Sequence, residues 1–557
     1  INRSSINQKY YFILILPRKS IRMTKIKFIL FCLLTSLVFT KVQAQKEQSR
    51  VEILQAEQLL GGSGFERLLT DVILKHKTSL IYCDSAHFYS EDNLAKLFGN
   101  VKIDDQEDSV TVTSRYAEYD GNTQLALLRN NVVLVNEGTT LYTDFLDYNR
   151  ANGEAIYFNS GMVKDSTNVL TSEKGIYETQ IEKITFNKKV VLENPDYTMR
   201  SNSLFYYTTT KIAETEKLTN ILSKEGNRLN AQKGSFYDTE NKIFRFYDGD
   251  VESETSIVYG EELFFDENAQ YYEAKENVSI YNKEQNAEVF GDEGKYWEGK
   301  QYSEVYGNAL VRKYFEVDTL FMIADTLISQ DGQNAEDKYT LAYPNMRLIK
   351  GELAGRADSM AYIYADSTVH LYTDPILWNN KSQITADSIQ FTIANQEIDQ
   401  ALLKDNAFAI TRDTIANFNQ IKGRKMTGYF LDGDMEKLDV EGNGESLYFA
   451  IENDTTIKGI NKLLCGRIIM EFKEGTVSRI SHTIKPEASF TPPHLFEKGE
   501  QKLEGFIWRG EERPNKKQID DWRTPKIRDK NRYSFFDEPE VELPYPENDE
   551  IQILIDN

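Results

Sequence analysis

The sequence predicts an all-β protein, an elongated array of stacked strands built from repeats of about 30 residues. Short runs along the chain alternate apolar and polar residues, which is the pattern of strands with one buried face. The chain is rich in aromatic residues, with 32 Tyr and 30 Phe, and has only 12 Pro. This composition favours strands over disorder. Long amphipathic helical patterns are hard to find between residues 70 and 450.

The stretch 101–119 shows the repeating unit most clearly. Val101 and Ile103 alternate with polar residues, and Ala117 and Tyr119 do the same. Each pair therefore places two apolar side chains on one face of a strand.

The unit returns at a nearly constant spacing of about 30 residues. We expect a Gly-Asn turn at residues 99–100 to open it and an Asp-Gly turn at residues 120–121 to close it. The aromatic residue that ends the unit recurs at Tyr89, Tyr119, Tyr148, Tyr177, Tyr206, Tyr237, Phe265 and Trp297. The apolar residue that opens it recurs at Val72, Val101, Val132, Met162, Val190, Ile221, Val251, Val278 and Ala309. Such a period, with two or more short strands in each unit, predicts a β-solenoid or a stacked-hairpin array.

The start of the chain has the pattern of an export signal. Residues 1–22 do not fit the rest and are interpreted as upstream translation. Residues 23–44 combine a basic start, an apolar run and a small-residue cleavage site ending at Ala44, which predicts a cleaved signal peptide. The apolar run is too short to span a bilayer as a helix, although an uncleaved anchor stays an alternative.

The rest of the chain divides by composition. The repeat array is expected over residues 45–475, most clearly over 70–410, followed by a tail rich in proline and charge over 476–557. Loss of residues 1–44, which hold eight Lys or Arg and no acid, would leave 57 basic and 87 acidic residues, a net charge of −30. Such a body is repelled by nucleic acids, so no nucleic-acid partner is expected.

The sequence predicts no catalytic activity, no metal site and no cofactor. Exported β-helices are often carbohydrate-active enzymes, whose sites need carboxylates on neighbouring rungs, but here the acids fall on polar faces or in turns such as 248–250. The five histidines, 76, 87, 370, 482 and 494, lack the spacing of metal ligands. Cys83 and Cys465 lie far apart in the chain and are expected to be free or buried.

Two motifs alternate through the array. Endings of the form A-x-Y-D, as in Ala117-Glu118-Tyr119-Asp120, alternate with openings such as Gly99-Asn100-Val101 and Glu276-Asn277-Val278. With a predicted export signal, this repetition resembles the OstA-like family, which includes the periplasmic lipopolysaccharide-transport protein LptA and the N-terminal domain of the outer-membrane translocon LptD. The resemblance covers roughly residues 50–410. The chain is longer than the family's small bridge protein and is most similar to the long OstA-like form of the Bacteroidetes.

The resemblance implies a fold of stacked V-shaped antiparallel strands, with two sheets meeting along one edge and a hydrophobic groove along the stack. It also implies a periplasmic protein, associated with the inner or outer membrane, that carries lipopolysaccharide or lipid A by its acyl chains. The candidate residues for the groove lining are Val101, Ile103, Ala117, Tyr119, Val132, Leu134, Tyr148, Val190, Leu192, Tyr206, Val251, Phe265, Val278 and Ile280. The alternative for these residues is that they fill a closed β-core, as most apolar stripes do.

The resemblance further implies partners at both ends of the array: inner-membrane Lpt transporter components and the outer-membrane translocon, joined by addition of edge strands. Val51 and Ile53 in the first strand are candidates for such docking. Trp508, Arg509 and Trp522 in the tail are further candidates, because Trp and Arg are frequent at binding hot spots. The alternative for the tail is that its aromatic residues fold back on the last rung.

Two rival functions stay open. One is a structural or adhesive solenoid without a lipid ligand. The other is a translocon-like membrane protein, but the chain lacks the many long amphipathic strands that a membrane barrel needs.

Overall fold

The computed structural model describes residues 49–526 and 534–537, apart from residues 63, 108, 333, 396, 432, 433, 454, 474, 475, 496 and 498–500. The segments 1–22 and 23–44, interpreted as upstream translation and signal peptide, lie outside the described residues. All the strands belong to the unit that begins at Val51.

Antiparallel strands, joined into one continuous hydrogen-bonded sheet, form almost the whole of this unit. The first section comprises β1 (Glu52–Gln55), β2 (Gln58–Gly61), β3 (Glu66–His76), β4 (Ser79–Tyr89), β5 (Leu94–Asp105), β6 (Val110–Asp120), β7 (Leu125–Asn136), β8 (Thr139–Asn149), β9 (Glu154–Lys164), β10 (Val169–Glu178), β11 (Lys183–Glu193) and β12 (Tyr197–Tyr207). The middle section comprises β13 (Ile212–Thr215), β14 (Thr219–Ser223), β15 (Arg228–Ala231), β16 (Ser235–Asp238), β17 (Ile243–Glu252), β18 (Ser256–Asp266), β19 (Tyr271–Asn282), β20 (Ala287–Trp297), β21 (Tyr302–Tyr314) and β22 (Thr319–Gln330). The last section comprises β23 (Tyr339–Tyr343), β24 (Arg347–Lys350), β25 (Leu353–Arg356), β26 (Ser359–Ile363), β27 (Thr368–Tyr372), β28 (Ile376–Asn379), β29 (Ser382–Thr385), β30 (Ser388–Ala394), β31 (Glu397–Arg412), β32 (Phe418–Leu431), β33 (Asp434–Glu452), β34 (Thr456–Lys473), β35 (Thr476–Thr483) and β36 (Glu487–Thr491).

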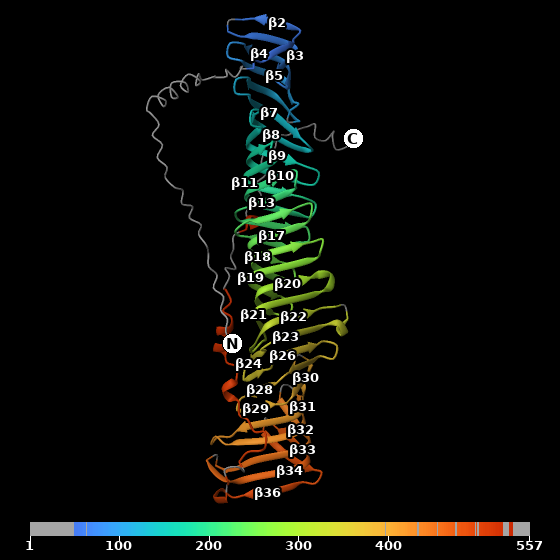
Figure 1. The fold of residues 1–557 in the computed structure, drawn as a ribbon, viewed down its shortest axis with the longest axis vertical. Coiled ribbons are helices and arrows are strands. Elements are labelled where there is room, and N and C mark those ends of the chain that lie inside the picture. The colour runs from blue at the N-terminus through green and yellow to red at the C-terminus, as the bar shows by residue number, and fades with distance from the viewer. Residues whose placement is uncertain are drawn as a thin grey trace, which may run out of the picture. The chain divides into compact units, whose positions relative to one another are not determined.

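The strands follow one another along a single axis in chain order, from β2 to β36 (Figure 1). Each predicted unit of about 30 residues supplies two rungs of this stack, as β5 and β6 do. Because adjacent strands lie about 4.8 Å apart, the array is on the order of 130 Å long. The predicted all-β array is confirmed.

Most rungs are single strands that bend in the middle, so each rung is V-shaped. In β5 the bend lies at Gly99 and Asn100, whose φ angles are 70° and 43°, and the register with both neighbours shifts there. Two successive left-handed residues turn the strand sharply without reversing it. Asn100 also donates to the Asp84 carboxylate of the preceding rung, at 3.1 Å. The Gly-Asn pair expected to be a turn is therefore a corner inside a strand, whereas β6 ends at Asp120, as expected for the Asp-Gly turn.

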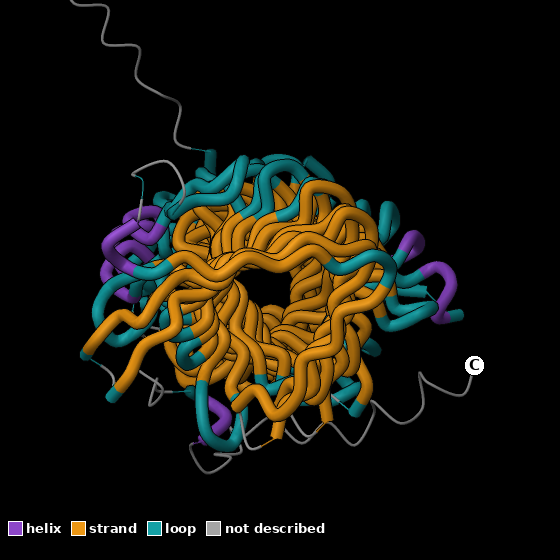
Figure 2. Tube along the Cα trace, turned by 90° about the horizontal axis from the view of Figure 1, so that it is seen from below, coloured by secondary structure: helices purple, strands orange, loops and turns teal. Residues whose placement is uncertain are grey.

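The corners divide the array into two sheets. Sheet A is the part of each rung between its corner and the first row of turns, for example 90–93, 121–124 and 150–153. Sheet B is the part between the corner and the second row of turns, for example 106–109 and 165–168. Seen end on, the strands surround a common axis (Figure 2).

Some rungs consist of two separate strands, one in each sheet. Between β22 and β31, the strands β23, β26, β27 and β30 lie in sheet A, and β24, β25, β28 and β29 lie in sheet B. Pro344 and Pro375 stand at two of these corners. Proline has no N–H for the ladder, so it favours a break there.

The segment after residue 475 contains more than a tail. The array continues through β35 and β36, past the expected boundary. Residues 501–526 then run back along the outer face of sheet B, and this segment is called the strap. Its short helix α2 (Lys516–Trp522) packs Ile519 against Leu310 and Ile323, on the face opposite the interior.

Candidate functional site: the interior between the sheets

One inward-facing residue from each rung of sheet B forms a continuous row along the array. The backbone register places each member beside the next from Ile53 to Leu463. Only Gly355 and Ser446 interrupt an otherwise apolar series. It runs Ile53, Leu74, Ile81, Ile103, Val112, Leu134, Leu141, Val163, Leu170, Leu192, Met199, Ile221, Leu229, Val251, Val258, Ile280, Val289, Val311, Met322, Leu348, Gly355, Leu377, Ile384, Ala409, Ile421, Ser446 and Leu463.

All fourteen candidate lining residues face this interior or pack against it. Eleven are at most 1% exposed, namely Val101, Ile103, Ala117, Tyr119, Val132, Leu134, Tyr148, Val190, Leu192, Tyr206 and Val278. The other three, Val251, Phe265 and Ile280, are partly exposed and pack against the same core. All three lie in β17 to β19, where Val278 is the one buried candidate.

From β3 to β12, here called the closed half, side chains fill the interior. Leu128 and Phe186 are fully buried. Tyr157 lies across the middle of this half, and its hydroxyl meets the Ser172 hydroxyl at 2.6 Å. A Cβ at Gly175 would lie 2.2 Å from the Tyr157 ring, so this position needs glycine to admit the ring.

The outer edges of the two sheets are also joined in the closed half. The line along which these edges face each other is called the mouth. Tyr177 of sheet A donates to Asn136 of sheet B at 2.6 Å, and Tyr206 donates to the Asp165 carboxylate. Tyr237 packs edge-on against Tyr197 across the same line, with ring centroids 5.3 Å apart.

A buried polar group closes the mouth near β3. The Tyr119 hydroxyl lies 2.6 Å from Nδ1 of His76, on the opposite sheet edge. Arg150, which follows β8, forms an ion pair with Asp105 at 2.5 Å and donates to the Tyr119 hydroxyl at 3.4 Å. Burial raises the pKa of the Tyr119 phenol, so it stays a neutral donor and acceptor.

The partners of the Asp165 carboxylate determine the direction of its pKa shift. Burial alone would raise its pKa, but hydrogen bonds from the Tyr206 hydroxyl and from the backbone and side chain of the 167–168 turn hold the pKa below its ordinary value. Burial and the Asp165 charge raise the pKa of Tyr206. The pair therefore favours a carboxylate that accepts from a neutral phenol.

From β17 to β32, here called the open half, the interior is less covered. Val258, Ile280, Val289, Val311 and Ile384 occupy the same row of sheet B as the fully buried Leu134 and Leu170, yet they are partly exposed. Within the open half, Met322 and Leu377 of this row are buried, at 7% and 6% exposed. On sheet A the residues nearest the mouth are also partly exposed, as Phe265, Tyr272, Tyr362 and Phe391 are. The partly exposed apolar lining of this half is called the slit.

The open half differs from the closed half in two features of its sequence. The tyrosine slot becomes Phe265, which has no hydroxyl, and the Tyr272 hydroxyl donates to Glu298 in its own row of turns, at 2.6 Å. The deep row of sheet A carries Ala274 and Gly294 where the closed half carries Leu128 or Phe186. Fewer cross-links and smaller side chains leave the slit open.

The sequence analysis missed the partners of the tyrosines. His76, Asn136 and Asp165 precede their tyrosines by 43, 41 and 41 residues, an offset that the 30-residue period does not suggest. The period also placed three members on the wrong face. Tyr89, Met162 and Trp297 lie in outward rows, and their neighbours Phe88, Val163 and Tyr296 hold the inward positions.

The first strands close one end of the array. Val51 is buried and donates its N–H to Asn93 at 2.9 Å, across the mouth. Ile53 lies in β1 opposite Leu74. Among the described strands, β1 and β2 pair only with β3, and Leu59 and Leu60 of β2 are about half exposed (56% and 49%). One edge of this terminal rung is thus available for pairing.

The three candidate docking residues of the tail contact the array itself. Trp508 packs on Phe418, with ring centroids 5.0 Å apart. Arg509 pairs with Asp374 at 2.7 Å. Trp522 packs with the cluster around Ile519 on β20 to β22. Docking of these residues to a partner stays a prediction.

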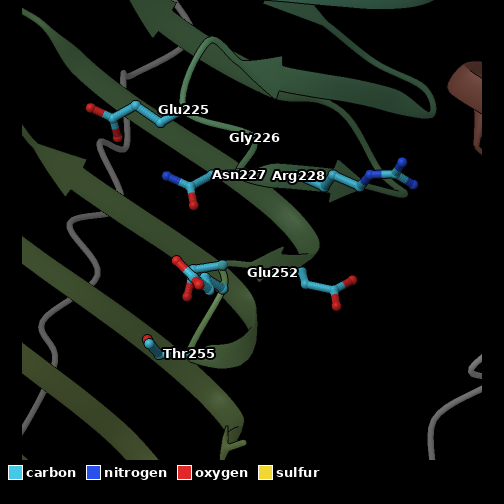
Figure 3. A pocket seen from close by; sticks show the side chains of 8 residues that line it. Glu225, Gly226, Asn227, Arg228, Glu252 and Thr255 are labelled. Atoms are coloured by element: carbon cyan, nitrogen blue, oxygen red, sulfur yellow. The ribbon is translucent and has the colours of Figure 1, made fainter.

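A polar hollow lies beside the start of the open half. It is formed by two neighbouring turns of the second row, at 224–227 and 253–255, and Figure 3 shows Glu225, Arg228 and Glu252 around it. Its lining is charged and open to solvent, which does not suit an acyl chain.

Other kinds of site receive no support within the described part of the chain. No group of three or more His, Cys, Asp or Glu side chains there could hold a metal ion. None of the helices described is long and apolar enough to cross a membrane. Cys83 and Cys465 are free and buried, as predicted, and burial raises the pKa of the Cys83 thiol to about 12.

Together, the strands and their interior define an all-β repeat protein in which two sheets enclose an apolar row along the whole array. Residues 49–202 match the family model described as OstA-like protein. This match agrees with the family that the repeated motifs of the sequence indicated. Comparison with curated proteins found no match.

Proposed function

We propose that this protein is a periplasmic lipid carrier that moves lipopolysaccharide toward the outer membrane by holding its acyl chains between the two sheets. The observation that supports it most directly is the apolar row of sheet B, which runs through the array and is partly exposed in the open half. The family of residues 49–202 is consistent with this role.

To hold the lipid, the protein needs only to shield the apolar acyl chains from water. Each CH₂ group removed from water contributes about 0.8 kcal/mol, so a chain lying along several rungs is held without any polar contact. Neighbouring members such as Val258, Ile280 and Val289 are similar in size and chemistry. A chain can therefore slide along the row, because no rung holds it much better than the next.

The head group would project through the mouth into solvent. The protein carries 87 acidic and 65 basic residues, so its surface does not grip phosphates strongly. Weak attachment of the head group suits a carrier that must release its cargo. No step in this role needs a catalyst, and we propose that the protein is not an enzyme.

Export by the segment 23–44 would place the protein in the periplasm. Edge strands at the ends of the array would then join it to inner-membrane Lpt transporter components and to the outer-membrane translocon. The unpaired edge of β1 and β2 supports this arrangement.

Lipid uptake by the protein from residue 45 onward tests the proposal. A fluorescent fatty acid is bound and then displaced by lipid A. Val289→Asp places a charge in the slit and should weaken uptake about tenfold or more. The matched control is Val317→Asp, because Val317 is 97% exposed in a turn of the same half. Equal uptake by the two variants would contradict the proposal.

The filled interior of the closed half is what a structural solenoid without a ligand would show. That alternative is supported if the wild-type protein takes up neither the fatty acid nor lipid A.

A further inference from the structure

The exposure of the interior residues changes along the array. Leu134 and Leu170 in the closed half are fully buried, and Val289 and Val311, in the same row of the open half, are partly exposed. The residues are alike in chemistry, so the difference comes from what covers them.

The closed half and the rungs beside it are covered by a series of contacts across the mouth, here called the latches. They comprise Val51 with Asn93, Asp105 with Arg150, His76 with Tyr119, Asn136 with Tyr177, Asp165 with Tyr206, and Tyr197 with Tyr237. Each joins an edge of sheet A to the edge of sheet B. They occur at successive positions along the closed half, so no length of several rungs is left unlatched.

The interior behind the latches is also occupied. Tyr157 spans it over Gly161 and Gly175, where a Cβ would lie 2.5 Å and 2.2 Å from the ring. Its hydroxyl is bonded to Ser172. An acyl chain could occupy this region only if Tyr157 moved and the mouth opened.

We propose that the acyl-chain site is confined to the open half, from β17 to β32, and that the latches make the closed half a gated section which admits cargo only when they open. This inference rests on the proposed function. It names the part of the interior that holds the lipid and the groups that regulate its passage.

The latches are suited to reversible opening. Four of the six are hydrogen bonds, and all six lie at the sheet edges, away from the corners that hold the two sheets together. Opening them leaves every backbone ladder intact. Neighbouring latches belong to different rungs, so they can open one after another as a chain advances.

Photo-crosslinking maps the occupied interior without any substitution. Lipid A with a diazirine at the end of an acyl chain is loaded onto the wild-type protein from residue 45 onward, irradiated, and the labelled residues are identified by mass spectrometry. We expect labels at positions such as Val289, Val311, Ile384 and Phe391, and several-fold fewer labels within residues 66–207.

A latch variant then tests the gate. Tyr177→Phe combined with Tyr206→Phe keeps both rings but removes two latches. It should increase the labels within residues 66–207 several-fold. The matched control is Tyr207→Phe, because Tyr207 faces outward beside Tyr206.

The outcomes separate the two claims. Labels spread evenly over both halves of the wild-type protein would overturn the confinement and leave the proposed function standing. Labels confined to the open half in both the wild type and the double variant would overturn the gate. No labels in any protein would overturn the proposed function, and this inference with it.

Discussion

Tyrosine combines two properties that the closed half requires at one position. Its ring fills the interior, and its hydroxyl reaches a polar group on the opposite edge, as Tyr177 and Tyr206 do. Tyr237 follows them in the slot, and at the position after it Phe265 keeps the ring without the hydroxyl. The mouth opens where the hydroxyl is lost.

Tyr177→Phe should destabilise the closed half by about 1–3 kcal/mol, because the buried Asn136 would lose the hydrogen bond that this hydroxyl donates. Amide hydrogen exchange of residues 169–193 measures the effect. Tyr207→Phe, on the outer face, should change protection by less than about 0.5 kcal/mol. A similar effect of both substitutions would show that the hydroxyl of Tyr177 does not hold the mouth.

Acid should weaken the latch at Asp165. Its pKa in the folded protein lies below the ordinary value of 3.8, so the unfolded chain binds the proton more readily. The stabilisation is present above pH 3.8 and is lost as the pH falls through the folded pKa. Protection factors of residues 165–207, measured between pH 6 and about pH 3, should fall at the acid end, and less so in Tyr206→Phe. An unchanged slope in that variant would contradict the assignment.

Sequence reasoning predicted the contacts of single residues least well. The period identified Tyr119, Tyr148, Tyr177 and Tyr206 as inward-facing. Their partners lie at the ends of strands or in turns and share no residue type, so no repeated motif marks them. Whether a given apolar residue is covered depends on those partners, and for this reason the repeat pattern alone does not separate the open half from the closed half.

At the scale of elements, the strap is the largest departure from expectation. Gln383 accepts from the backbone of Arg509 and donates to the carbonyl of Ile507, at 2.7 Å and 2.9 Å. These contacts join residues more than 100 positions apart, a separation at which local patterns carry no information. The corners, in contrast, follow from local pairs such as Gly99-Asn100 and could have been recognised from them.

Ile519→Ala should loosen the strap, because Ile519 is 1% exposed against Leu310 and Ile323. The expected cost is about 2 kcal/mol or more. Limited proteolysis within residues 501–526 should become faster. Lys517→Ala changes an exposed residue of the same helix and should leave the rate unchanged; equal cleavage of the two variants would contradict this account of the strap.

The terminal rung provides a test of docking. Leu59→Lys combined with Leu60→Lys alters two exposed side chains of β2 and should abolish one envelope partner contact without lowering the unfolding midpoint. Crosslinking in the envelope followed by purification measures the contact. If every crosslinked partner is retained, this edge is not the docking site.

At the scale of the whole molecule, the period predicted the stacked array, with two or more strands in each unit. The apolar row and the two sheets follow from the same alternation of residues. The period does not predict the division into an open and a closed half. That division depends on contacts across the mouth and on the volumes of Ala274 and Gly294 relative to Leu128 and Phe186. These are differences within a repeat whose pattern stays constant.

Native mass spectrometry of the protein purified from its own envelope tests the central claim most directly. The account predicts a bound lipid with the mass of lipopolysaccharide or lipid A, retained by Val317→Asp and strongly reduced in Val289→Asp. A protein that carries no lipid from the envelope and takes up no added lipid A would contradict it.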